Sequence, residues 1–142
     1  MNTESKVFYV EDNPDDIKLT SLALRKAGIT VQLETAMDGD QAIAALKDRS
    51  PSDLPDCILL DLKLSCSSGL EVLAWIRSQP HLKRLPVIML SSSLLSSDIN
   101  QAYELGANSY LLKPADLSSL IALTKTIDLY WLKTNVRPLG LV

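Results

Sequence analysis

Several features are scarce in this chain, and each absence narrows the range of functions. Its 142 residues include one histidine and two cysteines, Cys57 and Cys66. Cys57 falls within a short apolar run and Cys66 in the loop after it, so we expect no disulfide between them. Their spacing fits no metal motif, and without clustered cysteines we expect no zinc site around His81. This cysteine usage is typical of a reduced compartment, and we predict a cytoplasmic location.

Long hydrophobic runs and a strong charge of one sign are also missing. No apolar run approaches the roughly 20 residues of a membrane span, and residues 1–6 lack the apolar segment of a signal peptide. The net charge of −3 gives no basis for binding nucleic acid or an anionic membrane. We predict a single domain over residues 1–142, with a core at about 6–132, a short tail at 133–142 and no output domain.

An apolar run between two acidic residues, Asp56 and Asp61, is the central feature of the sequence. Residues 57–60 are too few for a helix and show no polar alternation, which is typical of a strand buried on both faces of a parallel sheet. Asp61 then lies at the carboxyl end of a central strand, where ligands bind in open α/β sheets. It is either a solvated strand-end residue or the centre of the chemistry.

Strands and helices alternate five times along the chain. Asn13 and Asp116 are predicted helix caps, and Gly28 is predicted to end the first helix. The other strands are expected at 6–10, 30–36, 85–90 and 108–112, and the helices at 14–27, 41–47, 70–78, 94–105 and 117 to about 132. This alternation predicts an α/β fold, a doubly wound parallel sheet with right-handed crossovers and helices on both faces.

Four of the predicted strands end in side chains suited to a metal ion or a phosphate, namely Glu11 and Asp12, Asp61, Ser91, and Lys113. The carboxyl ends of parallel strands meet at one edge, so these residues can converge. Three carboxylates repel each other unless a cation neutralises them, and a hard divalent cation such as Mg²⁺ suits oxygen ligands. A lysine and a hydroxyl can hold phosphoryl oxygens. The set suits phosphoryl transfer to a carboxylate, which makes an aspartyl phosphate.

Each of these residues also has a plain structural interpretation. Glu11 and Asp12 can complement a helix dipole, Lys113 can be a solvated surface lysine, and Ser91 can be a loop or cap residue. Tyr110 can be an ordinary strand aromatic. The conjunction favours chemistry, because the residues fall at the ends of four strands on one edge.

These residues give the chain a resemblance to the receiver domains of two-component response regulators, the CheY-like family, over about residues 6–130. The matching features are the acidic pair Glu11-Asp12, the phosphoacceptor Asp61, Gly69, Ser91, the small pair Gly106-Ala107, the aromatic Tyr110 and the pair Lys113-Pro114. The resemblance implies a flavodoxin-like sheet of five parallel strands in the order 2-1-3-4-5.

The resemblance also implies a set of roles. Glu11, Asp12 and Asp61 would bind Mg²⁺ directly or through water, and the backbone carbonyl of Lys63 would complete the protein ligands. Asp61 would attack the phosphohistidine of a sensor histidine kinase. The domain would then be a phosphoacceptor for signalling, catalysing only its own phosphorylation and dephosphorylation.

Three further residues would respond to the phosphoryl group. Lys113 would pair with it, Ser91 would swing inward to bond it, and Tyr110 would follow into the vacated space. The resemblance further implies a cis peptide bond between Lys113 and Pro114.

Two positions depart from the family pattern. Ser65 stands four residues after the acceptor, where the family often has proline, so we expect the loop at 65–68 to be less rigid. Lys63 places a cation near the mouth of the site and is expected to alter the dephosphorylation rate.

A narrower resemblance concerns the single-domain regulators paired with bacterial and cyanobacterial phytochrome kinases. It rests on residues 10–16, 82–86 and 130–132. The implied partner is a phytochrome-type sensor kinase, with signalling through the domain's own surface or transfer of the phosphoryl group to a downstream protein. Those regulators often dimerise through the last helix and strand. Tyr130, Trp131 and Leu132 are therefore either an apolar dimer patch or part of the domain's own core.

The sequence leaves three other functions to compare with that of a receiver. A haloacid-dehalogenase-type phosphatase has Asp-x-Asp after the strand, whereas position 63 here is Lys, and it needs more chain. A flavodoxin holds a flavin phosphate in its first loop, and the acidic residues at 11–16 would repel that phosphate. A pseudo-receiver acts only by binding partners, and the complete set of site residues argues against it.

Overall fold

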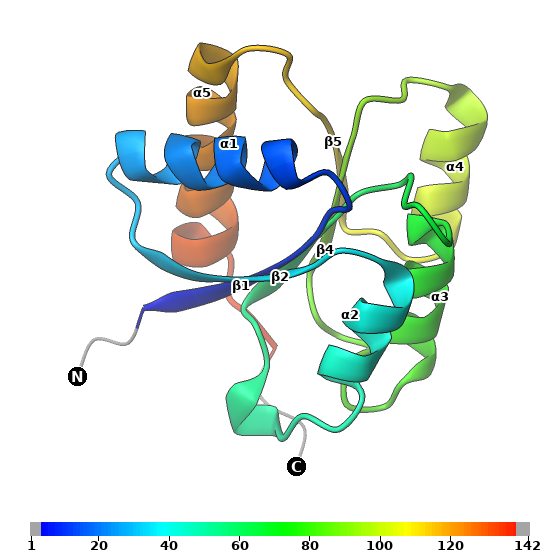
Figure 1. The fold of residues 1–142 in the computed structure, drawn as a ribbon. Coiled ribbons are helices and arrows are strands. Elements are labelled where there is room, and N and C mark those ends of the chain that lie inside the picture. The colour runs from blue at the N-terminus through cyan, green and yellow to red at the C-terminus, as the bar shows by residue number, and fades with distance from the viewer. Residues whose placement is uncertain (1–3, 139–142) are drawn as a thin grey trace.

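Five parallel strands with helices on both faces form the part of the chain that the computed structural model describes, residues 4–138 (Figure 1). The strands are β1 (Ser5–Val10), β2 (Val31–Ala36), β3 (Cys57–Leu60), β4 (Val87–Ser91) and β5 (Ser109–Leu112). Their order in the sheet is β2-β1-β3-β4-β5. The predicted doubly wound, flavodoxin-like fold is confirmed, and the order reverses between β1 and β3.

The helices divide between the two faces of the sheet (Figure 1). One face carries α1 (Pro14–Lys26) and α5 (Leu117–Ile127), and the other carries α2 (Gly39–Leu46), α3 (Gly69–Ser78) and α4 (Ser96–Glu104). A 3₁₀ turn at Pro51–Asp53 precedes β3. Each face therefore has its own apolar core beneath its helices.

The central strand β3 supplies side chains to both cores. All four of its residues are buried. Ile58 and Leu60 pack into the core under α2 and α3, while Cys57 and Leu59 pack into the core under α5. Burying such side chains contributes about 1.5–3 kcal/mol each. The prediction of a strand buried on both faces is confirmed, and its rigid setting fixes the position of the residue that follows it.

The starts of α2 and α4 differ from the predicted bounds because side chains accept hydrogen bonds from backbone amides there. α2 begins at Gly39 rather than 41, since Asp38 accepts a 2.7 Å hydrogen bond from the amide of Gln41. α4 begins at Ser96 rather than 94. The hydroxyl of Ser93 accepts from the amide of Leu95 at 3.2 Å, which keeps this segment out of the helix.

The last helix changes its winding near its end. α5 ends at Ile127, and the chain continues in wider, π-type turns through Asp128–Thr134. The chain is therefore helical to 132, as predicted, but its α-helix ends at Ile127 and the rest is a π-helix. Residues 139–142 of the predicted tail lie outside the described residues.

The predicted cis bond is wrong. Residues 4–138 contain no cis peptide bond, so Lys113 and Pro114 are joined in the trans form. The trans form is favoured intrinsically by about 0.5–1 kcal/mol at a bond before proline.

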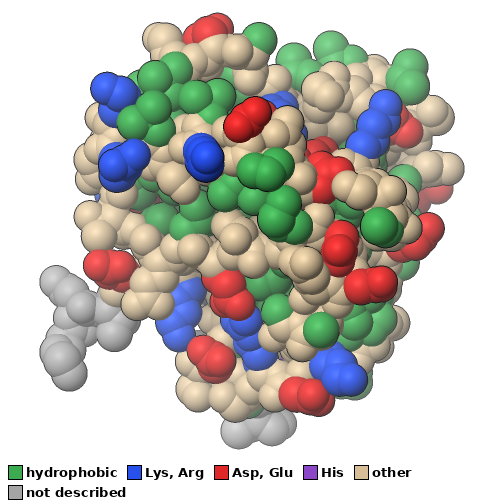
Figure 2. All heavy atoms as spheres, viewed as in Figure 1, with side chains coloured by type: hydrophobic (Ala, Val, Ile, Leu, Met, Phe, Trp, Pro, Cys, Tyr) green, Lys and Arg blue, Asp and Glu red, His purple; other side chains and the backbone are tan. Residues whose placement is uncertain are grey.

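Both cysteines are free, Cys57 buried and Cys66 exposed, as predicted. Within the described part of the chain, no helix is both long and apolar enough to span a membrane. Figure 2 shows acidic and basic side chains interspersed with apolar ones on the face in view. That mixture agrees with the small net charge of −3.

Arg77 on α3 joins three segments that are distant in sequence. Its guanidinium donates to the backbone oxygens of Gly106 at 2.7 and 2.9 Å, Leu85 at 2.8 Å and Lys83 at 3.1 Å, and to Asn108 Oδ1 at 2.8 Å. The loop before β4 and the loop before β5 are thereby tied to α3. The sequence pattern alone gave no indication of this network.

We expect Arg77→Ala to lower the free energy of unfolding by about 3 kcal/mol, because four oxygen acceptors lose a charged donor. Urea denaturation measures this change. Arg84→Ala is the matched control, since Arg84 is exposed and makes no hydrogen bond or ion pair among the described residues. Equal midpoints for the two variants would contradict the role of the network.

Candidate functional site

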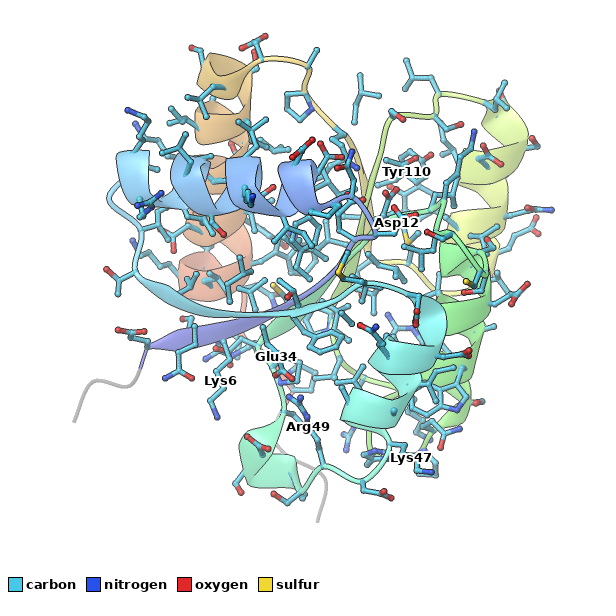
Figure 3. All side chains as sticks on the ribbon, viewed as in Figure 1. Lys6, Asp12, Glu34, Lys47, Arg49 and Tyr110 are labelled. Atoms are coloured by element: carbon cyan, nitrogen blue, oxygen red, sulfur yellow. The ribbon has the colours of Figure 1, made fainter. Side chains whose placement is uncertain are left out.

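The register of the sheet brings the predicted site residues to one edge. Val10 and Leu60 are partners in adjacent strands, so Glu11 and Asp61 follow them side by side. The amide of Asp61 donates to the Val10 oxygen at 3.0 Å, which extends the ladder to the site itself. Figure 3 shows Asp12 toward this edge, and Lys6, at the start of β1, toward the opposite one.

The ammonium of Lys113 contacts three carboxylates at this edge. Its Nζ lies 2.5 Å from Glu11 Oε1, 3.1 Å from Asp16 Oδ2 and 3.2 Å from Asp61 Oδ2. The lysine side chain is 17% exposed, so it is not the solvated surface lysine of the alternative interpretation. It joins one residue of α1 to the residues that directly follow β1 and β3.

Glu11 is almost completely enclosed, with 1% of its surface exposed. Its Oε1 accepts from the Tyr9 hydroxyl at 3.2 Å and its Oε2 from the Asn13 amide at 3.2 Å. Burial raises the pKa of the Glu11 carboxyl to about 7, the ammonium of Lys113 opposes that rise, and the charge of Asp61 adds to it. Glu11 is thus a carboxylate whose charge requires a cation nearby.

Lys113 responds in the opposite sense. Burial lowers the pKa of its ammonium, but the carboxylates of Glu11 and Asp61 more than offset this, so its pKa lies above the usual value. Lys113 therefore remains a fixed positive charge beside Asp61.

Three carboxylates meet the requirements of a divalent cation site. One oxygen from each of Glu11, Asp12 and Asp61 lies within 4.8 Å of the others. These are the hard oxygen ligands that Mg²⁺ or Mn²⁺ prefers. With Asp16 there are four carboxylates at the site, three of which contact the single ammonium of Lys113, so the local charge fits a divalent cation.

The loop after β3 contacts the site and is held by one isolated antiparallel bridge. Lys63 and Ser68 form an isolated antiparallel bridge, and the amide of Lys63 donates to Asp61 Oδ1 at 3.4 Å. Gly69 follows, where a Cβ would lie 2.0 Å from the backbone oxygen of Asp61. Only glycine fits at this close approach, which is the physical reason for the residue that the sequence analysis singled out.

Ser91 and Tyr110 are linked to each other through Ser93. Ser91 is 2% exposed, and its Oγ accepts from the Ser93 amide at 3.1 Å. The hydroxyl of Tyr110 donates to the Ser93 oxygen at 2.8 Å. Among the described residues Ser91 makes no side-chain hydrogen bond to Asp61. The two predicted switch residues are therefore near the site and connected, but not part of the carboxylate cluster.

Asp16 and Tyr9 complete the site and were missed as individual residues by sequence reasoning. Asp16 is part of the acidic turn, and its place four residues after Asp12, in the first turn of α1, was an available signal. Tyr9 lies two residues before Glu11, and alternate residues of an extended chain point to the same side. The contact between the two side chains could therefore have been predicted from the sequence.

Comparisons with known proteins agree with this geometry. Residues 7–125 match the family described as the response regulator receiver domain. The chain is 36% identical over 140 residues to the response regulator Rcp1 of Synechocystis sp., covering 96% of this chain and 95% of Rcp1.

Two solved structures extend the comparison. The phosphorylated cyanobacterial phytochrome response regulator RcpA superposes with a TM-score of 0.87 at 42% identity, covering 96% of this chain and 99% of that one. The Mn²⁺-bound form of Rcp1 superposes with a TM-score of 0.82 at 36% identity, covering 94% and 99%.

The raised pKa of Glu11 predicts that binding of a cation at this cluster would depend on pH. Below about pH 7 the buried carboxyl is expected to be protonated in the metal-free protein, and Mg²⁺ would have to displace that proton to bind there. We expect the Mg²⁺ affinity measured by calorimetry to fall by about tenfold from pH 8 to pH 6. Glu11→Gln is the isosteric control and should flatten the dependence. Equal wild-type affinities at the two pH values would contradict this assignment.

Proposed function

The chain belongs to the family of response regulator receiver domains, and from this membership we propose that it accepts a phosphoryl group on Asp61 from a sensor histidine kinase, with Mg²⁺ as cofactor. The observation that carries the proposal is the contact of the Lys113 ammonium with both Asp61 and Glu11. It places a strand-end carboxylate beside a fixed positive charge, at the carboxyl edge of the sheet.

In the transfer step, an oxygen of Asp61 forms a bond to phosphorus while the bond from phosphorus to the kinase histidine breaks. Lys113 holds a phosphoryl oxygen by its charge. Glu11, Asp12, Asp61 and the backbone carbonyl of Lys63 would hold Mg²⁺, which supplies positive charge to the phosphoryl oxygens. The domain thereby catalyses its own phosphorylation and, with water as the acceptor, its own dephosphorylation.

The switch in this proposal runs through Ser93. The proposed inward swing of Ser91 would move its Oγ, which accepts from the amide of Ser93, away from that amide. The backbone oxygen of Ser93 in turn accepts from the hydroxyl of Tyr110, so the movement would reach Tyr110 through Ser93. Movement of this segment carries the exposed side chains of Leu94 and Leu95, which are 66% and 63% exposed. Phosphorylation would thus alter an apolar part of the surface.

A phytochrome-type kinase is the proposed partner. The support is that RcpA is named as a cyanobacterial phytochrome response regulator and that the chain matches it over nearly its whole length. We propose that this chain likewise acts as a single receiver domain, signalling through its surface or passing the phosphoryl group to a downstream protein. Its two free cysteines fit the reducing conditions of the cytoplasm, which is the proposed location.

Self-association through the last helix and β5 is a further part of the proposal. The segment 130–132 is partly core and partly surface. Trp131 and Leu132 pack against the core under α5, whereas Tyr130 is 50% exposed and available for a contact between chains. Leu129 beside it is 64% exposed. An apolar surface of this kind is typical of a contact between protein chains.

The receiver family argues against the other functions that the sequence left open. A flavodoxin would place a phosphate among Glu11, Asp12 and Asp16, whose charges would repel it. A haloacid-dehalogenase-type phosphatase would need a second aspartate at position 63, where this chain has lysine.

Labelling with acetyl phosphate and Mg²⁺, followed by intact mass, tests the proposed function. We expect the wild type to gain one phosphoryl group only when Mg²⁺ is present, and Asp61→Asn to gain none. Lys63→Ala should still label but with a changed phosphoryl lifetime, because it removes a charge near the mouth of the site. Equal loss of labelling in Asp61→Asn and Lys63→Ala would contradict the separate roles.

A wild type that gains no mass, under conditions in which a known receiver labels, would contradict phosphoacceptance itself. The protein would then be an adaptor that acts only by binding partners, and its surface would become the place to seek function.

Light scattering at high protein concentration, with and without a phosphoryl mimic, tests self-association. We expect a dimer, and we expect Leu129→Glu to shift it toward monomer by placing a charge in an apolar contact. Met37→Glu is the control, because Met37 is 39% exposed after β2, at the other edge of the sheet. A wild type that stays monomeric in both conditions would rule out the dimer.

A further inference from the structure

The departure from the family pattern at Ser65 has a direct consequence in the structure. The hydroxyl of Ser65 donates a 2.6 Å hydrogen bond to Asp12 Oδ2, across 53 positions of sequence. This contact joins the loop after β3 to the loop between β1 and α1. A proline at position 65 offers no hydroxyl, so the contact depends on the residue that is unusual here.

Asp12 differs from the other two carboxylates in how it is held. Glu11 is fixed by Tyr9, by the Asn13 amide and by Lys113. Asp61 is fixed by Lys113 and by the Lys63 amide. Among the described residues, the Ser65 hydroxyl makes the one hydrogen bond to the Asp12 carboxylate. Without it, the half-buried Asp12 side chain would be free to rotate.

We propose that Ser65 is a positioning residue for the cation site, whose hydroxyl orients the Asp12 carboxylate toward Glu11 and Asp61. The bond occupies Oδ2 from the loop side and leaves Oδ1 for a divalent cation. Groups that orient metal ligands in this way typically raise metal affinity by about 10- to 100-fold. The inference rests on the proposed function, because it assumes that the three carboxylates bind Mg²⁺.

The loop at 65–68, which the sequence predicts to be less rigid, is held by backbone contacts on both sides of Ser65. The loop is closed by the bridge between Lys63 and Ser68 and by the 2.7 Å bond from the Gly69 amide to the Leu62 oxygen. Ser65 lies between these fixed points, so its hydroxyl is presented to Asp12 by a supported backbone.

Calorimetric titration of Mg²⁺ into four variants tests the proposal. Ser65→Ala and Ser65→Pro both remove the hydroxyl and should weaken Mg²⁺ binding by about tenfold or more. Ser65→Thr keeps a hydroxyl at an exposed position and should stay within about twofold of the wild type.

Ser67→Ala is the matched control. It makes the same chemical change in the same loop, but the Ser67 Oγ is buried without a hydrogen-bond partner among the described residues. It should leave Mg²⁺ affinity unchanged. If backbone stiffness rather than the hydroxyl were important, Ser65→Pro would bind Mg²⁺ as tightly as the wild type, and that result would overturn the proposal.

Labelling with acetyl phosphate separates positioning from a general loss of structure. Ser65→Ala should label slowly at low Mg²⁺ and reach the wild-type rate when Mg²⁺ is saturating. A deficit that persists at saturating Mg²⁺ would overturn the inference.

The two levels of failure are distinguishable. A wild type that neither binds Mg²⁺ nor labels overturns the proposed function and this inference together. A wild type that does both, beside a Ser65→Ala variant with equal Mg²⁺ affinity, overturns the inference alone.

Discussion

The balance of charge around the Lys113 ammonium is the constraint on which the site depends. Two unit charges about 4 Å apart interact by about 4 kcal/mol at an effective dielectric constant near 20. Glu11, Asp16 and Asp61 all lie within 3.2 Å of the ammonium, and Asp12 lies beside them. One positive charge does not neutralise four carboxylates. A divalent cation can neutralise the excess negative charge. Together with Lys113, that cation can then hold a phosphoryl group.

The sheet makes this arrangement possible by placing Glu11, Asp61 and Lys113 directly after the ends of β1, β3 and β5. Pairing of Val10 with Leu60 sets Glu11 beside Asp61, and the Lys113 amide donates to the Ser91 oxygen at 2.7 Å. The hydrophobic cores fix the strands, and the strands fix the charges. The carboxylates are therefore held close together by packing elsewhere in the molecule, at a separation that they would not adopt as free groups.

Much of the site was predictable because its signals are local. An apolar run followed by a carboxylate identifies both β3 and Asp61, and the same logic locates Glu11 and Lys113. Features that depend on contacts between distant segments were not predictable. The hydrogen bonds of Arg77 form only when the loops before β4 and β5 meet α3 in the folded chain. The bond from Ser65 to Asp12 likewise forms only when the loop after β3 lies beside the loop after β1. The helix starts were misplaced where side chains such as Ser93 capture backbone amides.

The most direct test of the account is to locate the phosphoryl group on the chain. Borohydride reduces an aspartyl phosphate to homoserine, so peptide mapping of the labelled and reduced protein identifies the acceptor residue. The account predicts homoserine at position 61 and at no other acidic residue of the cluster. Homoserine at position 12 or 16, or none in a protein that carries the added mass, would contradict the assignment of Asp61 as the acceptor.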